Sequence, residues 1–206
     1  MIFPGYENIF SLSEPFATRP YRGSLSEERP RPDYLALTSG TFVPAQPIRI
    51  VPYGGREPQD FVWTDAAIIR LVSQRVIDLL RQNQIAGWST YPVQLYDRSK
   101  NLIEGFAGFS VIGRSGKIDP SLSTPFQKQF PGGIFPHFKG CLFEPASWDG
   151  SDVFSPEGTA HIFTTRKVLE LFEGSKVKNV RYRPITELDF GEYEKSLLEE
   201  KLRANS

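Results

Sequence analysis

The chain has little of what most catalytic and redox sites are made from. Its 206 residues include one cysteine, one methionine and two histidines. The single cysteine, Cys141, cannot form an internal disulfide, which is typical of a protein in a reducing compartment. Lysine plus arginine and aspartate plus glutamate number 24 each, so the formal net charge is zero. A neutral chain has no overall field that attracts a nucleic-acid backbone, and we expect no nucleic-acid partner.

Long apolar runs are also absent. No stretch approaches the ~18–20 apolar residues of a membrane-spanning helix. The first ten residues, MIFPGYENIF, have neither the basic region nor the apolar core of a signal peptide. We therefore expect a soluble cytoplasmic protein without a membrane partner. The content of 39% hydrophobic and 13% aromatic residues is enough to form a core.

The most informative feature that is present is an internal repeat. Residues 73–93 return without a gap as residues 165–185. Ser73 and Thr165 are suited to cap a helix start, and an apolar stripe at helical spacing follows each of them. Pro92 and Pro184 then favour an extended segment. The repeat predicts one helix-then-strand unit that is used twice.

The remaining segments predict an α+β fold with a mainly antiparallel sheet. Residues 1–33 are rich in proline and are expected to form an N-terminal arm, and residues 34–206 a single domain. Tyr34–Thr38 and Ile48–Val51 are predicted as short strands. A final helix is expected from about Phe190 to Arg203.

Two further segments lie before and after the first helix of the repeat. Residues 65–72 fit either one long helix opened by Thr64 or Asp65, or an extended run with the helix starting after Ser73. The repeat favours the second alternative. Tyr91–Tyr96 and Leu102–Ile112 are predicted to form a hairpin around a polar turn.

Residues 115–140 form a proline- and glycine-rich segment that is predicted to be a long loop, and such loops are often functional. Its phenylalanines could pin the loop to the core or act as aromatic anchors for a partner. Acidic residues of the final helix could likewise be a solvated face or contact a cationic partner. The candidate partner-binding residues are Phe126, Phe130, Phe135, Phe138, Glu192, Glu199 and Glu200.

Two motifs resemble known sites without their full chemistry. Residues 108–115 approach the phosphate-binding signature G-x-x-x-x-G-K-[ST], but Arg114 replaces the lysine and Pro120 follows where a helix should run. This segment is interpreted as a strand end. His137 and Cys141 have a spacing that two metal ligands could use, but the chain has too few histidines and cysteines for a usual zinc site. We expect no metal and no cofactor.

The segment from Trp148 to Phe154 has the most distinctive local sequence, with two aspartates around a glycine and aromatic residues at both ends. Asp149 and Gly150 predict a tight turn whose side chains bond the following amides. Trp148, Asp149, Gly150 and Asp152 are therefore interpreted as a structural motif. The enzymatic alternative is a small hydrolase or nuclease-like activity that uses His137 or His161 with Asp149 or Asp152, and no G-x-S-x-G elbow supports it.

Several segments of the sequence resemble a known group of proteins. The segments that carry the resemblance are 71–76 with 87–93, then 148–154, then 165–168 with 179–180. Together they are similar to small bacterial immunity or immunity-like proteins associated with polymorphic-toxin loci, over about residues 60–190. Related groups often carry paired C-x-x-C motifs, which this chain lacks. The resemblance implies a non-enzymatic protein that neutralises a cognate toxin by direct binding. A self-associating structural module is the other non-enzymatic alternative.

Overall fold

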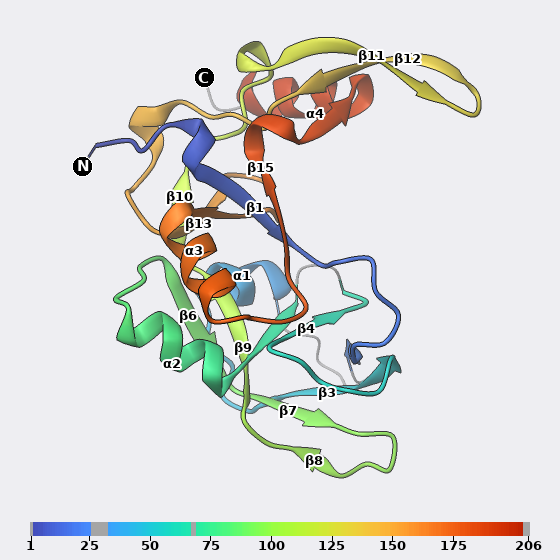
Figure 1. The fold of residues 1–206 in the computed structure, drawn as a ribbon, viewed down its shortest axis with the longest axis vertical. Coiled ribbons are helices and arrows are strands. Elements are labelled where there is room, and N and C mark those ends of the chain that lie inside the picture. The colour runs from blue at the N-terminus through green and yellow to red at the C-terminus, as the bar shows by residue number, and fades with distance from the viewer. Residues whose placement is uncertain (1, 26–32, 67–68, 204–206) are drawn as a thin grey trace. The chain divides into compact units, whose positions relative to one another are not determined.

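The computed structural model describes residues 2–25, 33–66 and 69–203. The fold is α+β with mainly antiparallel strands, two related helix-strand units and a C-terminal helix, as predicted (Figure 1). The chain groups into two compact units, where a single domain over residues 34–206 was expected. Unit 1 comprises residues 1–12, 113–169 and 182–206, and unit 2 comprises residues 13–112 and 170–181.

Unit 2 is built on one sheet in the order β6-β9-β5-β4-β2-β3-β7-β8. Its strands are β2 (Arg22–Leu25), β3 (Ile48–Gly54), β4 (Phe61–Thr64), β5 (Arg70–Ser73), β6 (Trp88–Tyr91), β7 (Val93–Tyr96), β8 (Leu102–Ile103) and β9 (Phe106–Val111). Its helices are α1 (Tyr34–Ser39) and α2 (Gln74–Gln82). Its core contains Leu37, Ile50, Val62, Ile69, Leu71 and Leu95.

Unit 1 holds two sheets, in the orders β10-β13-β14-β1-β15 and β11-β12-β16. The strands of the first are β10 (Gly113–Ser115), β13 (Val153–Pro156), β14 (Ile162–Thr165), β1 (Ile9–Ser13) and β15 (Arg181–Pro184). Those of the second are β11 (Thr124–Phe130), β12 (Gly133–Lys139) and β16 (Asp189–Gly191), followed by helix α4 (Glu192–Arg203). Short 3-10 turns lie at Tyr6–Asn8, Pro120–Leu122, Pro145–Ser147 and Ile185–Glu187. The core includes Ile9, Phe143, Phe154, Phe163 and Ile185.

The predicted repeat is confirmed at its helix. Helices α2 and α3 (Arg166–Gly174) are both nine residues long and start at residues 74 and 166. The chain leaves them through the same geometry, with positive φ at Gln84 and Lys176 and again at Gly87 and Asn179. Three backbone hydrogen bonds that close the helix end also recur in the same register.

The repeat extends further upstream than the sequence similarity. Strands β4 and β13 start at residues 61 and 153, and β5 and β14 at residues 70 and 162, which is the spacing of the two helices. Both pairs are antiparallel in matching register, with Phe61 opposite Val72 and Val153 opposite Thr164. Strands β2 and β10 each pair in parallel with the next repeated strand. Each copy is therefore a strand-rich scaffold.

The two copies exchange their first strands. In chain order the first copy runs β1-β2-β4-β5-α2-β6 and the second β9-β10-β13-β14-α3-β15. Strand β9 pairs antiparallel with β5 of the first copy, and β1 pairs antiparallel with β14 of the second. Each sheet thus obtains one strand from the other copy.

Several local expectations are corrected. Tyr34–Thr38 is helical, because Asp33 accepts hydrogen bonds from the amides of Leu35 and Ala36 and Gly40 ends the helix in the left-handed conformation. The segment 1–33, expected as an arm, contains β1 and β2. Its residues 26–32 lie outside the described part of the chain.

The extended alternative for residues 65–72 is confirmed at β5, where Ser73 caps α2 and accepts a hydrogen bond from the amide of Val76. Residues 67 and 68 of that segment lie outside the described residues. The predicted hairpin is confirmed only for β7 and β8. The later residues form β9, which pairs with β5 and β6 instead.

Candidate partner-binding surface

The segment 115–140, predicted to be a loop, forms a long β-hairpin. Strands β11 and β12 pair in antiparallel register over seven residues each, from Thr124 opposite Lys139 to Phe130 opposite Gly133. Two residues, Pro131 and Gly132, form the turn. In Figure 1 the hairpin extends beyond helix α4. Backbone pairing therefore holds in place the aromatic residues that the sequence had suggested for a partner contact.

One face of the hairpin carries an aromatic strip, which consists of Phe126, Phe130, Phe135 and His137. Residues directly opposite each other share a face, so the register places these four side chains together. The ring of His137 lies 5.9 Å from Phe126 and 5.2 Å from Phe130, and Phe130 lies 6.0 Å from Phe135. Phe130 is 37% and Phe135 47% exposed. The strip is thus preorganised by ring contacts, with Phe130 and Phe135 exposed to solvent and Phe126 and His137 partly buried.

The other face of the hairpin base packs into the core. Phe138 is buried and stacks on Phe190 with ring centroids 5.6 Å apart. The ammonium group of Lys195, on α4, lies 4.4 Å from the Phe138 ring centroid. Phe190, expected in the final helix, belongs to β16, which pairs with β12. Of the four candidate phenylalanines, three lie in the strip and Phe138 anchors the hairpin.

A charged cluster fixes the strip at its middle. Lys128 projects from the same face and forms an ion pair with Asp189 of β16. Arg183 lies 3.8 Å from the same carboxyl group. The hydrogen bond from Lys128, together with its charge, lowers the pKa of the Asp189 carboxyl group. Asp189 therefore stays ionised and ties the hairpin to β16.

Strand β11 is the open edge of this sheet. Among the described residues its only strand neighbour is β12. Phe130 and Gly133 flank the two-residue turn, so they form a hydrogen-bonded pair, and such pairs alternate along the ladder. The backbone groups of Gln127 and Gln129 consequently point outward, where another strand could pair with them.

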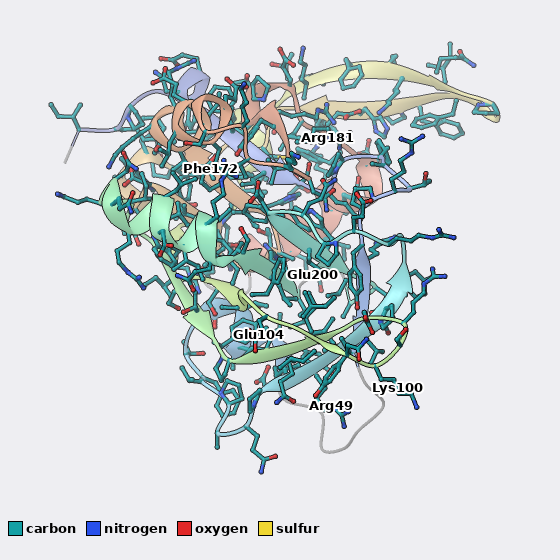
Figure 2. All side chains as sticks on the ribbon, turned by 60° about the horizontal axis from the view of Figure 1, so that its bottom comes forward. Arg49, Lys100, Glu104, Phe172, Arg181 and Glu200 are labelled. Atoms are coloured by element: carbon teal, nitrogen blue, oxygen red, sulfur yellow. The ribbon has the colours of Figure 1, made fainter. Side chains whose placement is uncertain are left out.

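The candidate acidic residues lie on α4. Glu192 and Glu200 are exposed, and Glu200 is labelled in Figure 2. A carboxyl oxygen of Glu199 lies 3.6 Å from the Lys195 ammonium group. The helix is in the same unit as the hairpin and packs against β12 and β16.

The residues of the enzymatic alternative have mainly structural contacts. His137 lies on β12, whereas Asp149 and Asp152 lie in the turn before β13 of the other sheet of unit 1. Asp149 accepts hydrogen bonds from the amides of Arg114 and Ser151, at 2.7 and 2.9 Å. Asp152 accepts from the Thr165 hydroxyl at 3.2 Å, and His161 stacks on Phe163 at 5.7 Å.

The distinctive string from Trp148 is a turn. Gly150 has φ 84°, in the region that favours glycine, and the Trp148 indole donates to the Ser151 carbonyl at 3.2 Å. Trp148 also packs on Phe154 of the core. The phosphate-loop-like residues 108–115 are the end of β9 and strand β10, as interpreted from the sequence. Within the described residues, no three acidic, histidine or cysteine side chains are grouped closely enough to hold a metal ion.

No local sequence pattern indicated that Lys128, His137 and Asp189 lie beside the phenylalanines. Had residues 124–130 been taken as a strand, the alternation of Phe126, Lys128 and Phe130 would have placed these three on one face. Pro125 and Pro131 argued against that assignment.

A comparison with known protein families finds no matching family, and a search among curated proteins also finds no match. In the described part of the chain, no helix has both the length and the apolar character needed to cross a membrane.

Proposed function

We propose that this protein neutralises a cognate bacterial toxin by binding it directly through the aromatic strip of the β11–β12 hairpin. The observation that carries the proposal is the exposure of Phe130 and Phe135 on a backbone ladder that is already ordered. Rigid aromatic side chains lose little conformational entropy on binding, and they dominate the energetics of many interfaces. The resemblance to immunity proteins suggests the class of partner.

The duplicated scaffold supports the choice of this surface. Between β10 and β13 the second copy carries the hairpin, whereas between β2 and β4 the first copy carries α1 and β3. A scaffold that is used twice accounts for what the copies share. The hairpin is a large difference between them, and a specific partner contact is expected where the copies differ.

The open edge of β11 suggests how the partner binds. An extended segment that adds to a sheet edge gains backbone hydrogen bonds from every second residue, while flanking side chains provide specificity. Gln127 and Gln129 would supply those backbone groups. Phe126 and Phe130 would lie beside the added strand on one face.

Replacing Phe130 and Phe135 together by serine tests the strip. We expect the affinity for a toxin domain encoded beside this gene to fall by roughly 100-fold or more, because aromatic anchors each contribute about 2 kcal/mol. The matched control is Phe42→Ser, which changes an aromatic residue of unit 2 that is 42% exposed. Titration calorimetry and protection of cells from the toxin are the measurements. Absence of any complex, or unchanged affinity in the double variant, would contradict the proposal.

Gln127→Pro tests the strand edge. Proline removes the outward N–H of residue 127, and Pro125 already occupies the equivalent outward position on the same strand. We expect toxin binding to weaken about tenfold while the melting temperature changes little. Lys128→Pro is the contrasting variant, since it removes an N–H that faces β12 and should disrupt the hairpin. If Gln127→Pro binds normally, partner pairing at this edge is excluded. Light scattering that shows a dimer would favour self-association instead.

A further inference from the structure

Three arginines from separate segments of unit 2 line one hollow. They are Arg19, Arg56 and Arg98, and the hollow has a volume of about 550 Å³. Thr18, Gly55 and Glu57 complete its lining. The site lies in unit 2, so its chemistry is independent of the hairpin of unit 1.

Backbone contacts hold the three segments together. The amide of Arg56 donates to the Arg19 carbonyl at 3.2 Å, and the amide of Tyr21 donates to the Glu57 carbonyl at 2.9 Å. The Arg98 guanidinium donates to the Gly55 carbonyl at 3.3 Å. The arginines are therefore brought together before any ligand binds.

Gly55 makes this close approach possible. Its φ is +62°, and a Cβ atom at this position would collide with the carbonyl group of Pro20. Any other residue would separate the two segments. The glycine thus supports the convergence of Arg19 and Arg56.

Positive charge dominates the hollow. Arginine remains protonated at physiological pH, and the lining contains three guanidinium groups but one carboxyl group, that of Glu57. Among the described residues, no carboxylate forms an ion pair with these three arginines. Lys100, labelled in Figure 2, lies two residues beyond Arg98 in the turn between β7 and β8.

We propose that the hollow binds the oligophosphate group of a small molecule. Guanidinium groups match phosphate oxygens through paired hydrogen bonds, and adjacent phosphates offer enough oxygens to engage three arginines at once. Thr18, also in the lining, carries a hydroxyl group that can donate a further hydrogen bond. Repulsion from Glu57 sets a limit on the affinity.

Titration calorimetry of the full chain with inorganic pyrophosphate, at fixed ionic strength, tests the site. We expect saturable binding at one site. Arg19→Gln, Arg56→Gln and Arg98→Gln should each weaken the Kd about tenfold, because each removes a charge-assisted contact. Glu57→Gln should tighten binding, because it removes the opposing charge. The matched control is Arg81→Gln, which changes an exposed arginine of α2 in the same unit and should leave the Kd unchanged.

A second arm with adenosine diphosphate identifies the source of the phosphates. Binding more than about tenfold tighter than pyrophosphate would indicate a nucleotide, and equal binding would indicate the oligophosphate itself. The proposal is overturned if pyrophosphate shows no saturable binding up to about 10 mM. It is also overturned if Arg81→Gln weakens binding as much as the site variants, or if Glu57→Gln weakens it.

Discussion

Asp60→Ala is expected to lower the free energy of unfolding by about 3–4 kcal/mol. Asp60 is buried, at 9% exposure, and its side chain accepts three hydrogen bonds. The donors are the Ser73 hydroxyl at 3.0 Å, the Arg75 guanidinium at 2.7 Å and the amide of Lys178 at 2.9 Å. Removing the carboxyl group leaves these donors without their acceptor, and each such loss in a buried setting costs about 1–3 kcal/mol.

Urea unfolding followed by fluorescence measures this effect. Asp152 occupies the equivalent position in the second copy, where it bonds Thr165 and Lys167. Because the Asp152 side chain is less buried than that of Asp60, with 17% exposed against 11%, Asp152→Ala should cost less, about 2 kcal/mol. Asp78→Ala, on the exposed surface of α2, is the control and should cost about 0.5 kcal/mol or less. An Asp60 variant as stable as the Asp78 variant would show that this hydrogen-bond cluster does not stabilise unit 2.

The Cys141 thiol is expected to react with thiol reagents about 1,000-fold more slowly in the folded protein than in urea at pH 8. Burial, with a smaller contribution from Glu194 and Asp189, raises the pKa of this thiol from 9.0 to about 12. Only the thiolate reacts, and its population falls tenfold for each unit by which the pKa rises. Absorbance of the released chromophore follows the reaction, and the single cysteine makes the signal unambiguous.

The same raised pKa predicts a pH dependence of stability. The unfolded thiol releases its proton from about pH 9, whereas the folded thiol holds it to about pH 12. The stabilisation is therefore complete below pH 9 and is lost as the pH rises toward 12. Cys141→Ala lacks this contribution, so wild type should lose stability between pH 9 and 10 relative to the variant. Rapid labelling of the native thiol, or parallel pH profiles of the two proteins, would contradict the burial of Cys141.

The helical part of the repeat was predictable because its signals are local. A capping hydroxyl, an apolar stripe and the end of the helix lie within about twenty residues in each copy. The extended run before the first helix was predicted, but the strands further upstream, β4 and β13, were not recognised as part of the repeat. A strand requires only alternating apolar residues, and the two copies use different residues at the matching positions. Phe61 and Val153 start matching strands without resembling each other in shape. Asp60 and Asp152 are separated by the same number of residues as the two helices of the repeat. This match could have shown that the repeat begins before residues 73 and 165.

The segment 115–140 was mistaken for a loop because its prolines suggest breaks. Pro125 and Pro136 occupy ladder positions whose nitrogen atoms point away from the partner strand, so neither interrupts the β11–β12 pairing. Tyr34–Thr38 was taken for a strand from its side chains, although Asp33 and Gly40 carry the capping signals of a helix. In both cases the structure depends on where a residue lies in the backbone hydrogen-bond pattern. The composition of the segment does not reveal that position.

The exchange of first strands affects how the protein is made. Leu12 of β1 pairs with Ile162, so the ribosome must add 150 further residues before this pair can form. At about 5–20 residues per second, β1 remains without its partner strand for roughly 8–30 s. During that time Ile9, Phe10 and Leu12, all buried in the folded protein, have no native neighbours in β14. The chain is therefore expected to depend on chaperones during synthesis more than a protein of its size with local pairing.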